Sequence, residues 1–392
     1  MAKVVLLSGC LMLVWIADLH GAPPIKNPAL AGAGPIDDLG RWLMSGREPQ
    51  QRRKLVTSGG GSEASEQAVE AGLKWIIAHQ LHDGSWNFDH GKAPKHAGPV
   101  NNPGRTQSTT GATALGLLPL LGAGYSHTAG PYQPEVKAGL DYLIKTMKRS
   151  DHGGDLRGTG GNMYTHGLAA ICLAEAYTMT QDPKLEDPAQ QAIKFIVYAQ
   201  DDVGGGWRYA PKTPGDTSVF GWQMTALWLG KLAKLEIPDK TIAGAKSFLN
   251  SVQVDQGAGY GYTTPAQRPA TTAIGLLSRL HLGGDRSDDG FQRGVAYVEQ
   301  QGPGEENTYF NYYATQVMHS MGGDAWQGWN KALRDRLVST QVKQGEATGD
   351  RGSWSTSQGH TGASGGRLCD TSFNLLTLEI YYRYRPLPAK EK

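Results

Sequence analysis

Three residues of this 392-residue sequence combine a titratable side chain with a place just ahead of an apolar run: Asp216, Asp370 and His166. A buried carboxyl group can hold a proton and pass it to a substrate, and an imidazole titrates near neutral pH. We therefore take the three as candidate catalytic residues. An Asp ahead of a helix is also a common N-terminal cap, and a buried histidine often serves the core alone, so both structural alternatives stay open.

Five aromatic residues near these positions are candidates for lining a ligand cavity. They are Tyr164, Trp222, Tyr309, Tyr312 and Tyr313. Aromatic ring faces attract cations and cover apolar ligands. Packing of the same rings between helices is the structural alternative.

No metal or other cofactor is expected. His166, Asp216 and the pair Cys369-Asp370 all precede apolar runs, which could suggest zinc. A zinc site needs several ligands that converge at about 2.0–2.3 Å, and the sequence has no Cys-x-x-Cys pair to begin one. Cys172 and Cys369 are predicted to be buried thiols that act as small apolar groups.

The elements that must position these residues recur along the chain. An aromatic residue, an aliphatic residue and a later Gln occur together at 75–80, 195–200 and 248–253. Weaker copies begin at Tyr142, Tyr297 and Arg336. Successive copies lie 39–67 residues apart, a period that indicates an array of helix pairs.

A turn of glycine and an aromatic residue follows several copies, at Gly84-Ser85-Trp86, Gly205-Gly206-Trp207, Gly259-Tyr260 and Gly352-Ser353-Trp354. Glycine can end a helix and let the aromatic side chain fold back onto it. A second apolar run comes next in each repeat. These runs are Thr110 to Leu121, Thr165 to Tyr177, Asp216 to Leu235, Thr271 to Leu282, Tyr312 to Met321 and Asp370 to Tyr384.

Apolar residues in the first helix of each pair are spaced i, i+3, i+4, which predicts helices and not strands. The second helices are apolar nearly all round, as expected for helices packed on two sides. We therefore predict an all-α fold, a single (α/α)6 toroid of six helix pairs over residues 66–385, with the second helices inside. An open array would need polar terminal repeats, and the terminal repeats here are apolar.

The N-terminal part of the chain differs in composition. Residues 1–22 place one Lys before a 14-residue apolar stretch, which predicts a signal peptide or an N-terminal anchor. Residues 23–65 are rich in Gly, Pro, Ala and Ser, which predicts a flexible, disordered leader. We expect an exported protein, periplasmic or anchored at the cell envelope, with membrane contact only through this segment and a short tail at 386–392.

Composition excludes several classes. The 38 Lys and Arg against 36 Asp and Glu give a net charge of +2, so no electrostatic footprint for nucleic acid exists. The 53 glycines would suit a disordered polymer, but 39% of the residues are hydrophobic. The glycines therefore separate packed elements.

Leu73-Lys74-Trp75-Ile76 with Gln80 and Gly84-Ser85-Trp86 resembles the QW repeat of squalene and oxidosqualene cyclases. Residues 55–388, with Gly205-Gly206-Trp207-Arg208-Tyr209, are similar to exported bacterial proteins with prenyltransferase and squalene oxidase repeats. The resemblance implies the same toroid and a cavity for an isoprenoid.

The sequence differs from that family at the positions of the family's catalytic residues. The resemblance implies an Asp-x-Asp-Asp-Thr motif, and only Asp216-Thr217 matches it, because Gly215 stands where the proton-donating Asp belongs. The zinc spacing of the related prenyltransferases is absent as well. Whether the protein is an enzyme therefore stays open.

Three functions remain as hypotheses. The first is a toroid that binds an apolar, isoprenoid-like small molecule or an envelope protein partner. The second is a squalene cyclase-like isomerase, and the third is a polysaccharide-processing toroid enzyme with paired carboxylates. The centre of the toroid discriminates between them: a filled centre favours binding, an apolar cavity with one acid favours the cyclase, and a polar cleft with two carboxylates favours the polysaccharide enzyme.

Overall fold

The computed structural model describes residues 38–95, 98–305, 307–343, 348–357 and 359–385. Regular structure in these ranges is almost entirely helical, which confirms the predicted all-α class. The predicted signal peptide or anchor and the predicted tail lie outside the described residues. None of the helices within the described ranges is long and apolar enough to cross a membrane.

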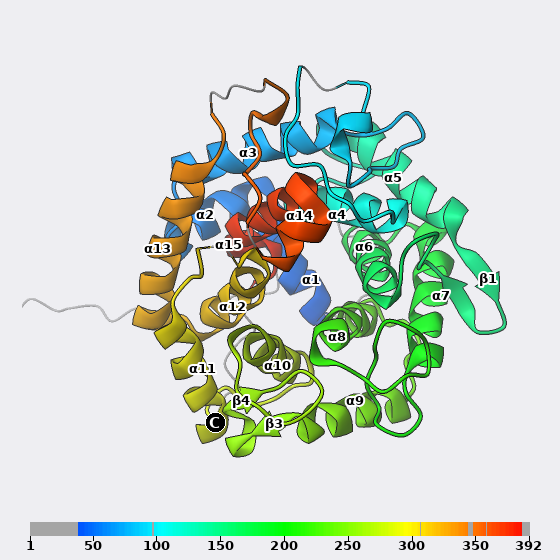
Figure 1. Cartoon of the computed structure of the whole chain (residues 1–392), viewed down its shortest axis with the longest axis vertical. Coiled ribbons are helices and arrows are strands. Elements are labelled where there is room, and N and C mark those ends of the chain that lie inside the picture. Colours follow the sequence, from blue (N-terminus) through cyan, green and yellow to red (C-terminus); the bar gives the residue numbers. More distant parts are fainter. Residues whose placement is uncertain (1–37, 96–97, 306, 344–347, 358, 386–392) are drawn as a thin grey trace, which may run out of the picture. The chain divides into compact units, whose positions relative to one another are not determined.

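Six inner helices form a closed ring in the described part of the chain (Figure 1). Each packs against the next one along the chain, and the last packs against the first. They are α4 (Thr109–Gly122), α6 (Met163–Thr180), α8 (Thr217–Leu232), α10 (Pro269–His281), α12 (Thr308–Met321) and α14 (His360–Leu378). Most of their residues are buried, as the apolar composition of the second runs predicts.

Six outer helices surround this ring (Figure 1). They are α3 (Glu63–Ala78), α5 (Gln133–Thr146), α7 (Pro183–Ala199), α9 (Asp239–Ser251), α11 (Asp289–Gln301) and α13 (Gly323–Thr340). Each buries one face only; on α3 that face carries Val69, Leu73 and Ile76. Buried and amphipathic helices thus alternate along the chain, so the predicted (α/α)6 toroid is confirmed.

The glycine-aromatic turns hold each pair together in the same way. The indole N–H groups of Trp86, Trp207 and Trp354 each donate to a carbonyl of the preceding outer helix at 2.8 Å. The side-chain amides of Gln80, Gln200 and Gln341 donate to the turn and to the next outer helix. A Cβ at Gly116 would lie 2.6 Å from the ring of Trp86, so glycine on α4 makes room for the indole.

Short strands and 3-10 turns complete the connections. Strand β1 (Lys148–Ser150) pairs antiparallel with β2 (Gly153–Asp155), with Arg149 opposite Gly154. Strand β3 (Gln253–Val254) pairs antiparallel with β4 (Gly259–Tyr260). The 3-10 turns between helices are η3 (His90–Lys92), η4 (Asp255–Gly257) and η5 (Thr348–Asp350).

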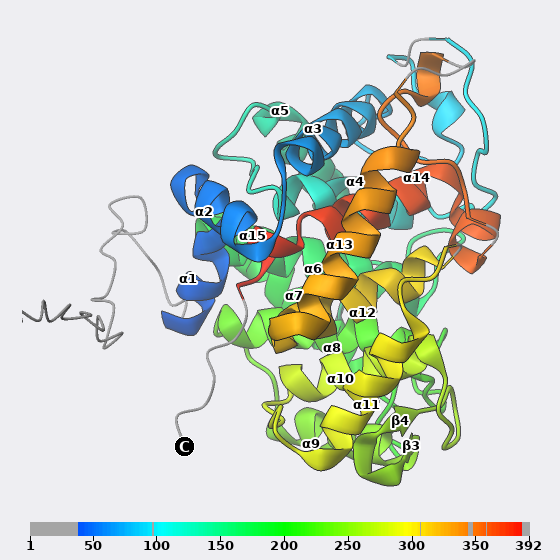
Figure 2. The ribbon, with the colours of Figure 1, turned by 90° about the vertical axis from the view of Figure 1, so that its left-hand side faces the viewer.

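One end of the toroid is covered by a closing segment made of α1 (Asp38–Met44), η2 (Ser45–Arg47), α2 (Pro49–Gly59) and α15 (Ile380–Arg383) (Figure 2). The flexible leader predicted for 23–65 is therefore wrong over 38–65, where α1, η2, α2 and the start of α3 lie. Leu43 and Val56 are buried there, and Arg47 forms an ion pair with Glu175 of α6 at 2.6 Å. The partner of Arg47 lies 128 residues away, so no local pattern reveals it.

Candidate functional site

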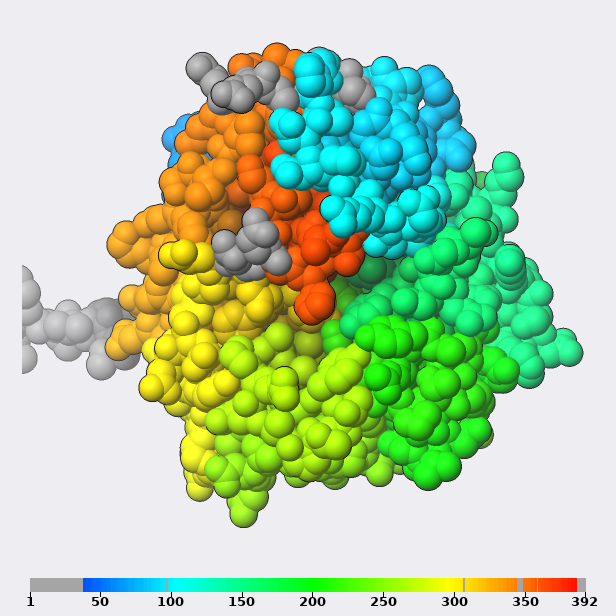
Figure 3. Space-filling view, in the orientation of Figure 1, coloured from blue at the N-terminus to red at the C-terminus, as the bar shows by residue number. Residues whose placement is uncertain are grey.

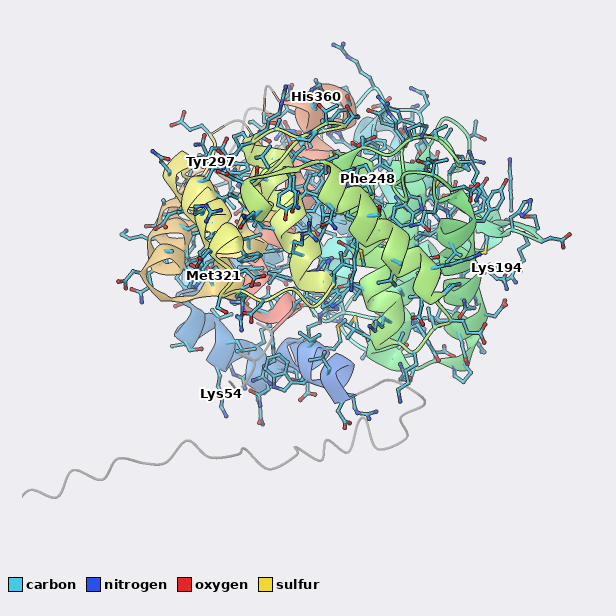
Figure 4. The ribbon with its side chains drawn as sticks, turned by 90° about the horizontal axis from the view of Figure 1, so that it is seen from below. Lys54, Lys194, Phe248, Tyr297, Met321 and His360 are labelled. Carbon is cyan, nitrogen blue, oxygen red and sulfur yellow. The ribbon has the colours of Figure 1, made fainter. Side chains whose placement is uncertain are left out.

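The mouth of the toroid is the end opposite the closing segment, where the inner helices begin. Figure 4 shows His360, at the start of α14, and Lys54, on α2, at opposite ends of the molecule. In the space-filling view the mouth is hollowed beside the orange-red start of α14, next to the teal and green segments that precede α6 and α8 (Figure 3). The mouth is therefore the accessible end of the lumen.

Asp216 lies at the mouth as the N-terminal cap of α8. Its Oδ1 accepts backbone N–H groups from Ser218 at 3.0 Å and Val219 at 2.9 Å. Its Oδ2 is buried with no hydrogen-bond partner among the described residues, 3.8 Å from Nε of Arg208. Burial raises the pKa of Asp216 above its usual range, although the two N–H groups, Arg208 and Tyr262 all act to lower it. One side chain thus combines a helix cap with a buried carboxyl oxygen that has no hydrogen bond.

Three hydroxyl groups meet next to this cap. The hydroxyl of Tyr164, on α6, donates to Oγ of Ser218 at 2.6 Å. Oγ of Ser218 lies 2.8 Å from the hydroxyl of Tyr309, on α12. Burial raises the pKa of both tyrosines, so both stay neutral and keep their protons for hydrogen bonding.

A second tyrosine pair stands on the other side of the cap. The hydroxyls of Tyr209 and Tyr262 are 2.7 Å apart, and Tyr209 is 44% exposed. The guanidinium of Arg208 lies 5.6 Å from the ring centre of Tyr209 and 5.8 Å from that of Tyr262. These distances are those of cation–π contacts. With Asp216, Ser218, Tyr164 and Tyr309, these three residues form what we call the mouth site.

Beneath the mouth site the lumen is filled by an aromatic floor, which consists of Trp222, Tyr312, Tyr313 and Phe373. Trp222 stacks on Tyr312 with ring centres 5.5 Å apart, and Tyr313 meets it edge-on at 5.4 Å. Phe373 lies 5.3 Å from Tyr312. All four are at most 3% exposed. The rings predicted to line a cavity therefore fall into two sets: Trp222, Tyr312 and Tyr313 pack the centre, whereas Tyr164 and Tyr309 reach the mouth.

His166 has a structural environment. Its Nδ1 accepts the backbone N–H of Leu156 at 3.1 Å, and its Nε2 lies 3.1 Å from the carbonyl of Ala192. The ring is fully buried, and burial lowers its pKa to about 4. Both ring nitrogens of the neutral imidazole are bonded to backbone groups of the protein. This geometry therefore does not support a catalytic role for His166.

Asp370 differs from Asp216 despite the shared Asp-Thr-Ser sequence. Helix α14 begins at His360, ten residues before Asp370, and runs through a kink at Gly366, so Asp370 does not cap it. One carboxylate oxygen accepts the hydroxyl of Thr308 at 2.8 Å, and the other accepts the N–H of Ser357 at 2.7 Å. Asp370 is fully buried and ties α12 and the turn before α14 together. The capping alternative is wrong for Asp370 and right for Asp216.

The residues that could suggest zinc do not form a site in the structure. Within the described ranges no three His, Cys, Asp or Glu side chains lie close enough to hold a metal ion. Burial raises the pKa of Cys172 and Cys369 well above the usual value for a thiol. Both are buried free thiols in the structure.

Sequence reasoning missed four members of the structural site: Arg208, Tyr209, Ser218 and Tyr262. Ser218 could have been found, because it lies two residues after Asp216 on the same helix start. Arg208 and Tyr209 directly follow the turn at Trp207, so the sequence pattern assigns them to the structural repeat. Tyr262 lies beyond β4, and only the tertiary fold brings it to Tyr209.

The toroid is shared with solved structures of different activities. An inactive variant of the α-1,6-mannanase GH76A of Salegentibacter sp., in complex with α-1,6-mannotriose, has a TM-score of 0.55 at 10% identity, covering 82% of this chain and 99% of that one. The type II terpene cyclase MstE from Scytonema has a TM-score of 0.54 at 13% identity, covering 81% and 98%. An α-amylase from Clostridium perfringens has a TM-score of 0.55 at 11% identity, covering 81% and 98%.

At such identities the likeness shows an α/α toroid, a fold used by terpene cyclases and by glycan-processing enzymes alike, and does not fix an activity. No family model and no curated relative match the chain. The toroid part of the predicted resemblance is therefore confirmed, and membership of the prenyltransferase and squalene oxidase repeat family is not shown. Function must be argued from the mouth site itself.

Proposed function

We propose that this protein is a saccharide-binding toroid of the cell envelope whose ligand lies across the mouth site. Export by the N-terminal segment is part of the proposal. The observation that carries it is the pairing of a filled lumen with a partly exposed rim of tyrosines and one arginine.

The aromatic floor limits where a ligand can lie. An isoprenoid chain needs an enclosed apolar cavity, and the centre of the ring is occupied by Trp222 stacked on Tyr312. Phe373 and Tyr313 close the remaining sides of this stack. A ligand at the mouth therefore rests above the floor, partly in contact with water.

The chemistry of the rim suits a saccharide. A sugar ring offers an apolar face of C–H groups and an edge of hydroxyls, and a tyrosine offers an apolar ring with a polar tip. Tyr209 and Tyr262 present such rings beside Arg208, a donor. Oδ2 of Asp216 supplies an acceptor once Arg208 moves aside.

The state of the carboxylates favours binding without hydrolysis. Most glycoside hydrolases need two carboxyl groups flanking the bond that breaks. At this mouth Asp370 has both oxygens occupied, and both oxygens of Asp155 accept Nε of Arg157. The mannanase variant is inactivated by replacing two adjacent aspartates. In the described residues the adjacent pairs Asp201-Asp202 and Asp288-Asp289 lie beside outer helices.

Calorimetric titration of the protein with α-1,6-mannotriose and with maltotriose tests the proposal. We expect measurable binding of at least one, weakened about tenfold in Tyr209→Ala and Tyr262→Ala, which corresponds to about 1.4 kcal/mol. Tyr297→Ala, on outer helix α11, is the matched control and should bind as the native protein does. Equal affinities in all four proteins, or no binding of either sugar, would contradict a saccharide site at this rim.

A second candidate function rests on Oδ2 of Asp216. A buried carboxyl group with a raised pKa at the start of an inner helix is what alkene protonation requires, and MstE is a type II terpene cyclase. Incubation of the protein with geranylgeranyl-bearing substrates, followed by mass spectrometry of organic extracts, tests it. Turnover that is lost in Asp216→Asn would favour the cyclase over the binding protein.

A further inference from the structure

A cavity of about 40 Å³ lies at the closed end of the toroid, between the closing segment and the ring. Leu43, Ile380 and Tyr384 line it from the closing segment and the residue after it. The ring contributes the last turns of α8, α10 and α12, with Trp228 from α8. Its size suffices for a few water molecules, and two histidines border it.

His281 ends α10 on one side of this cavity. Its ring stacks on Trp228, with centres 4.4 Å apart and planes 11° from parallel. Its Nδ1 is buried and has no hydrogen-bond partner in the described part of the chain. Burial lowers the pKa of His281 to about 3. The stack therefore holds a neutral imidazole whose ring nitrogen faces no acceptor.

His319 lies near the end of α12 on the other side. It is 9% exposed and meets Trp326 edge-on, with ring centres 4.8 Å apart. Burial lowers its pKa to about 4. Trp326 in turn donates to the carbonyl of Gly59 at 2.9 Å, the last residue of α2. His319 is thus linked to the closing segment through one indole.

The charged groups around the two histidines cannot balance a new positive charge. Besides the imidazoles, the ionisable residues that line the cavity are Tyr384 and Arg385, and none of its described lining residues is Asp or Glu. Glu175 lies behind Tyr384, where it already accepts Arg47 at 2.6 Å, Arg383 at 3.1 Å and the Tyr384 hydroxyl at 3.0 Å. Burial raises the pKa of Glu379, the residue before Ile380, well above its usual range, and Arg286 donates to the carbonyl of Ser320 in the cavity lining. A protonated His281 or His319 would therefore face Arg385 and Arg286 without an ionised carboxylate in the described lining.

We propose that His281 and His319 make the closed end an acid-sensitive latch, in which protonation of the two rings releases the closing segment from the ring. The closing segment lines the cavity opposite both histidines, with Leu43 from α1 and Ile380 from α15, and it is short. It therefore opens at lower cost than the twelve-helix toroid.

The direction of the pH dependence follows from linkage. The ordinary pKa of histidine is about 6.5, and in the closed state the two values are about 4 and about 3. An opened end binds protons that the closed end does not. The closed state is therefore fully favoured well above pH 6.5, and this advantage is lost as the pH falls from 6.5 through about 4 for His319 and about 3 for His281.

Release of the closing segment would also affect the aromatic floor. Nη1 of Arg383, in the closing segment, donates to the hydroxyl of Tyr312 at 3.3 Å. Tyr312 stacks on Trp222 directly below the mouth site. Release of Arg383 would remove this support, so ligand affinity should fall in acid; this consequence rests on the proposed saccharide site, whereas the latch does not.

Hydrogen exchange measured by mass spectrometry tests the latch without any ligand. Peptides from 38–59 are compared at pH 7.5 and pH 5.5, with labelling times scaled to equal intrinsic exchange and a peptide from α5 as internal reference. Protonation of each histidine should raise the exchange rate of 38–59 about tenfold at pH 5.5 relative to pH 7.5, because pH 5.5 lies one unit below the ordinary pKa of histidine. The α5 peptide should not change.

The variant His281→Phe/His319→Phe keeps both ring contacts with Trp228 and Trp326 and removes the titration. Its exchange over 38–59 should no longer rise at pH 5.5. His281→Gln/His319→Gln serves as a second variant if the larger rings do not fit. An absence of acid-induced exchange in the native protein, or an equal increase in either double variant, would overturn the latch.

Discussion

The two ends of the toroid are built from the same kinds of side chain and use them differently. At the closed end Glu175, Arg47 and Arg383 are at most 6% exposed and bonded to one another. At the mouth one oxygen of Asp216 has no hydrogen bond and only a long ion pair, at 3.8 Å, with Arg208, whose side chain is 40% exposed. Buried charged groups whose hydrogen bonds are all formed hold the elements of a protein together. Polar groups at the mouth with hydrogen-bonding capacity left over can bind a ligand.

The largest effect is expected from breaking the closed end. In Glu175→Gln, the buried guanidinium groups of Arg47 and Arg383 lose the carboxylate that both contact. Uncompensated buried charge costs about 3–5 kcal/mol, so the free energy of unfolding in urea should fall by that amount. Asp335→Asn, which breaks exposed pairs with Lys331 and Arg334, should change it by less than about 1 kcal/mol. Similar losses in both variants would mean that Glu175 does not join the segment to the ring.

Glu379 sharpens the comparison, because it is a carboxyl group at the closed end without a partner. Both of its oxygens are buried and lack hydrogen bonds within the described residues. Burial raises its pKa well above the ordinary 4.5, although Arg383, Arg52 and Arg47 oppose this effect. The folded state therefore keeps the proton that the unfolded chain releases above pH 4.5, and stability is lost as the pH rises toward the folded pKa.

Glu379→Gln should remove this loss. Relative to the native protein, the variant should gain stability between pH 5 and pH 8 by at most about 1.4 kcal/mol per pH unit, measured by urea unfolding at each pH. Glu175→Gln, whose native carboxylate has a pKa held below its usual range by Arg383 and Arg47 despite burial, should behave in the opposite way. A parallel response of the two variants to pH would show that Glu379 is ionised in the folded state.

The smallest effect is expected at the mouth. Asp216→Ala removes two bonds to the N–H groups that begin α8, and loss of such a cap costs about 1 kcal/mol. Asp216→Asn keeps an acceptor for the cap and removes the acid. Thermal unfolding should therefore show a lower stability for Asp216→Ala than for the native protein. The stability of Asp216→Asn should stay within a few tenths of a kcal/mol of the native value. If Asp216→Asn is as unstable as Asp216→Ala, the stabilising effect comes from the charge of Asp216 and not from its role as an acceptor.

The sequence-based predictions succeeded where local chemistry decides. Trp86, Trp207 and Trp354 are buried in the turns predicted for them, and Asp216 caps its helix. Prediction failed for Asp370, because the same Asp-Thr-Ser phrase lies inside a helix that begins earlier and bends at Gly366. An N-cap is set by where the chain enters the helix, and three letters of sequence do not specify that.

The repeat by itself determined the architecture of this protein. Apolar periodicity and glycine-aromatic turns act over a few residues, so they can be read along the chain, and helix pairs of this kind bury their apolar faces by closing into a ring. Tertiary structure alone decided which end is open. Arg47 meets Glu175 across 128 residues and Tyr209 meets Tyr262 across 53, and electrostatic pairing and burial depend on such distant neighbours. The mouth site and the histidine latch both arise from contacts of that kind.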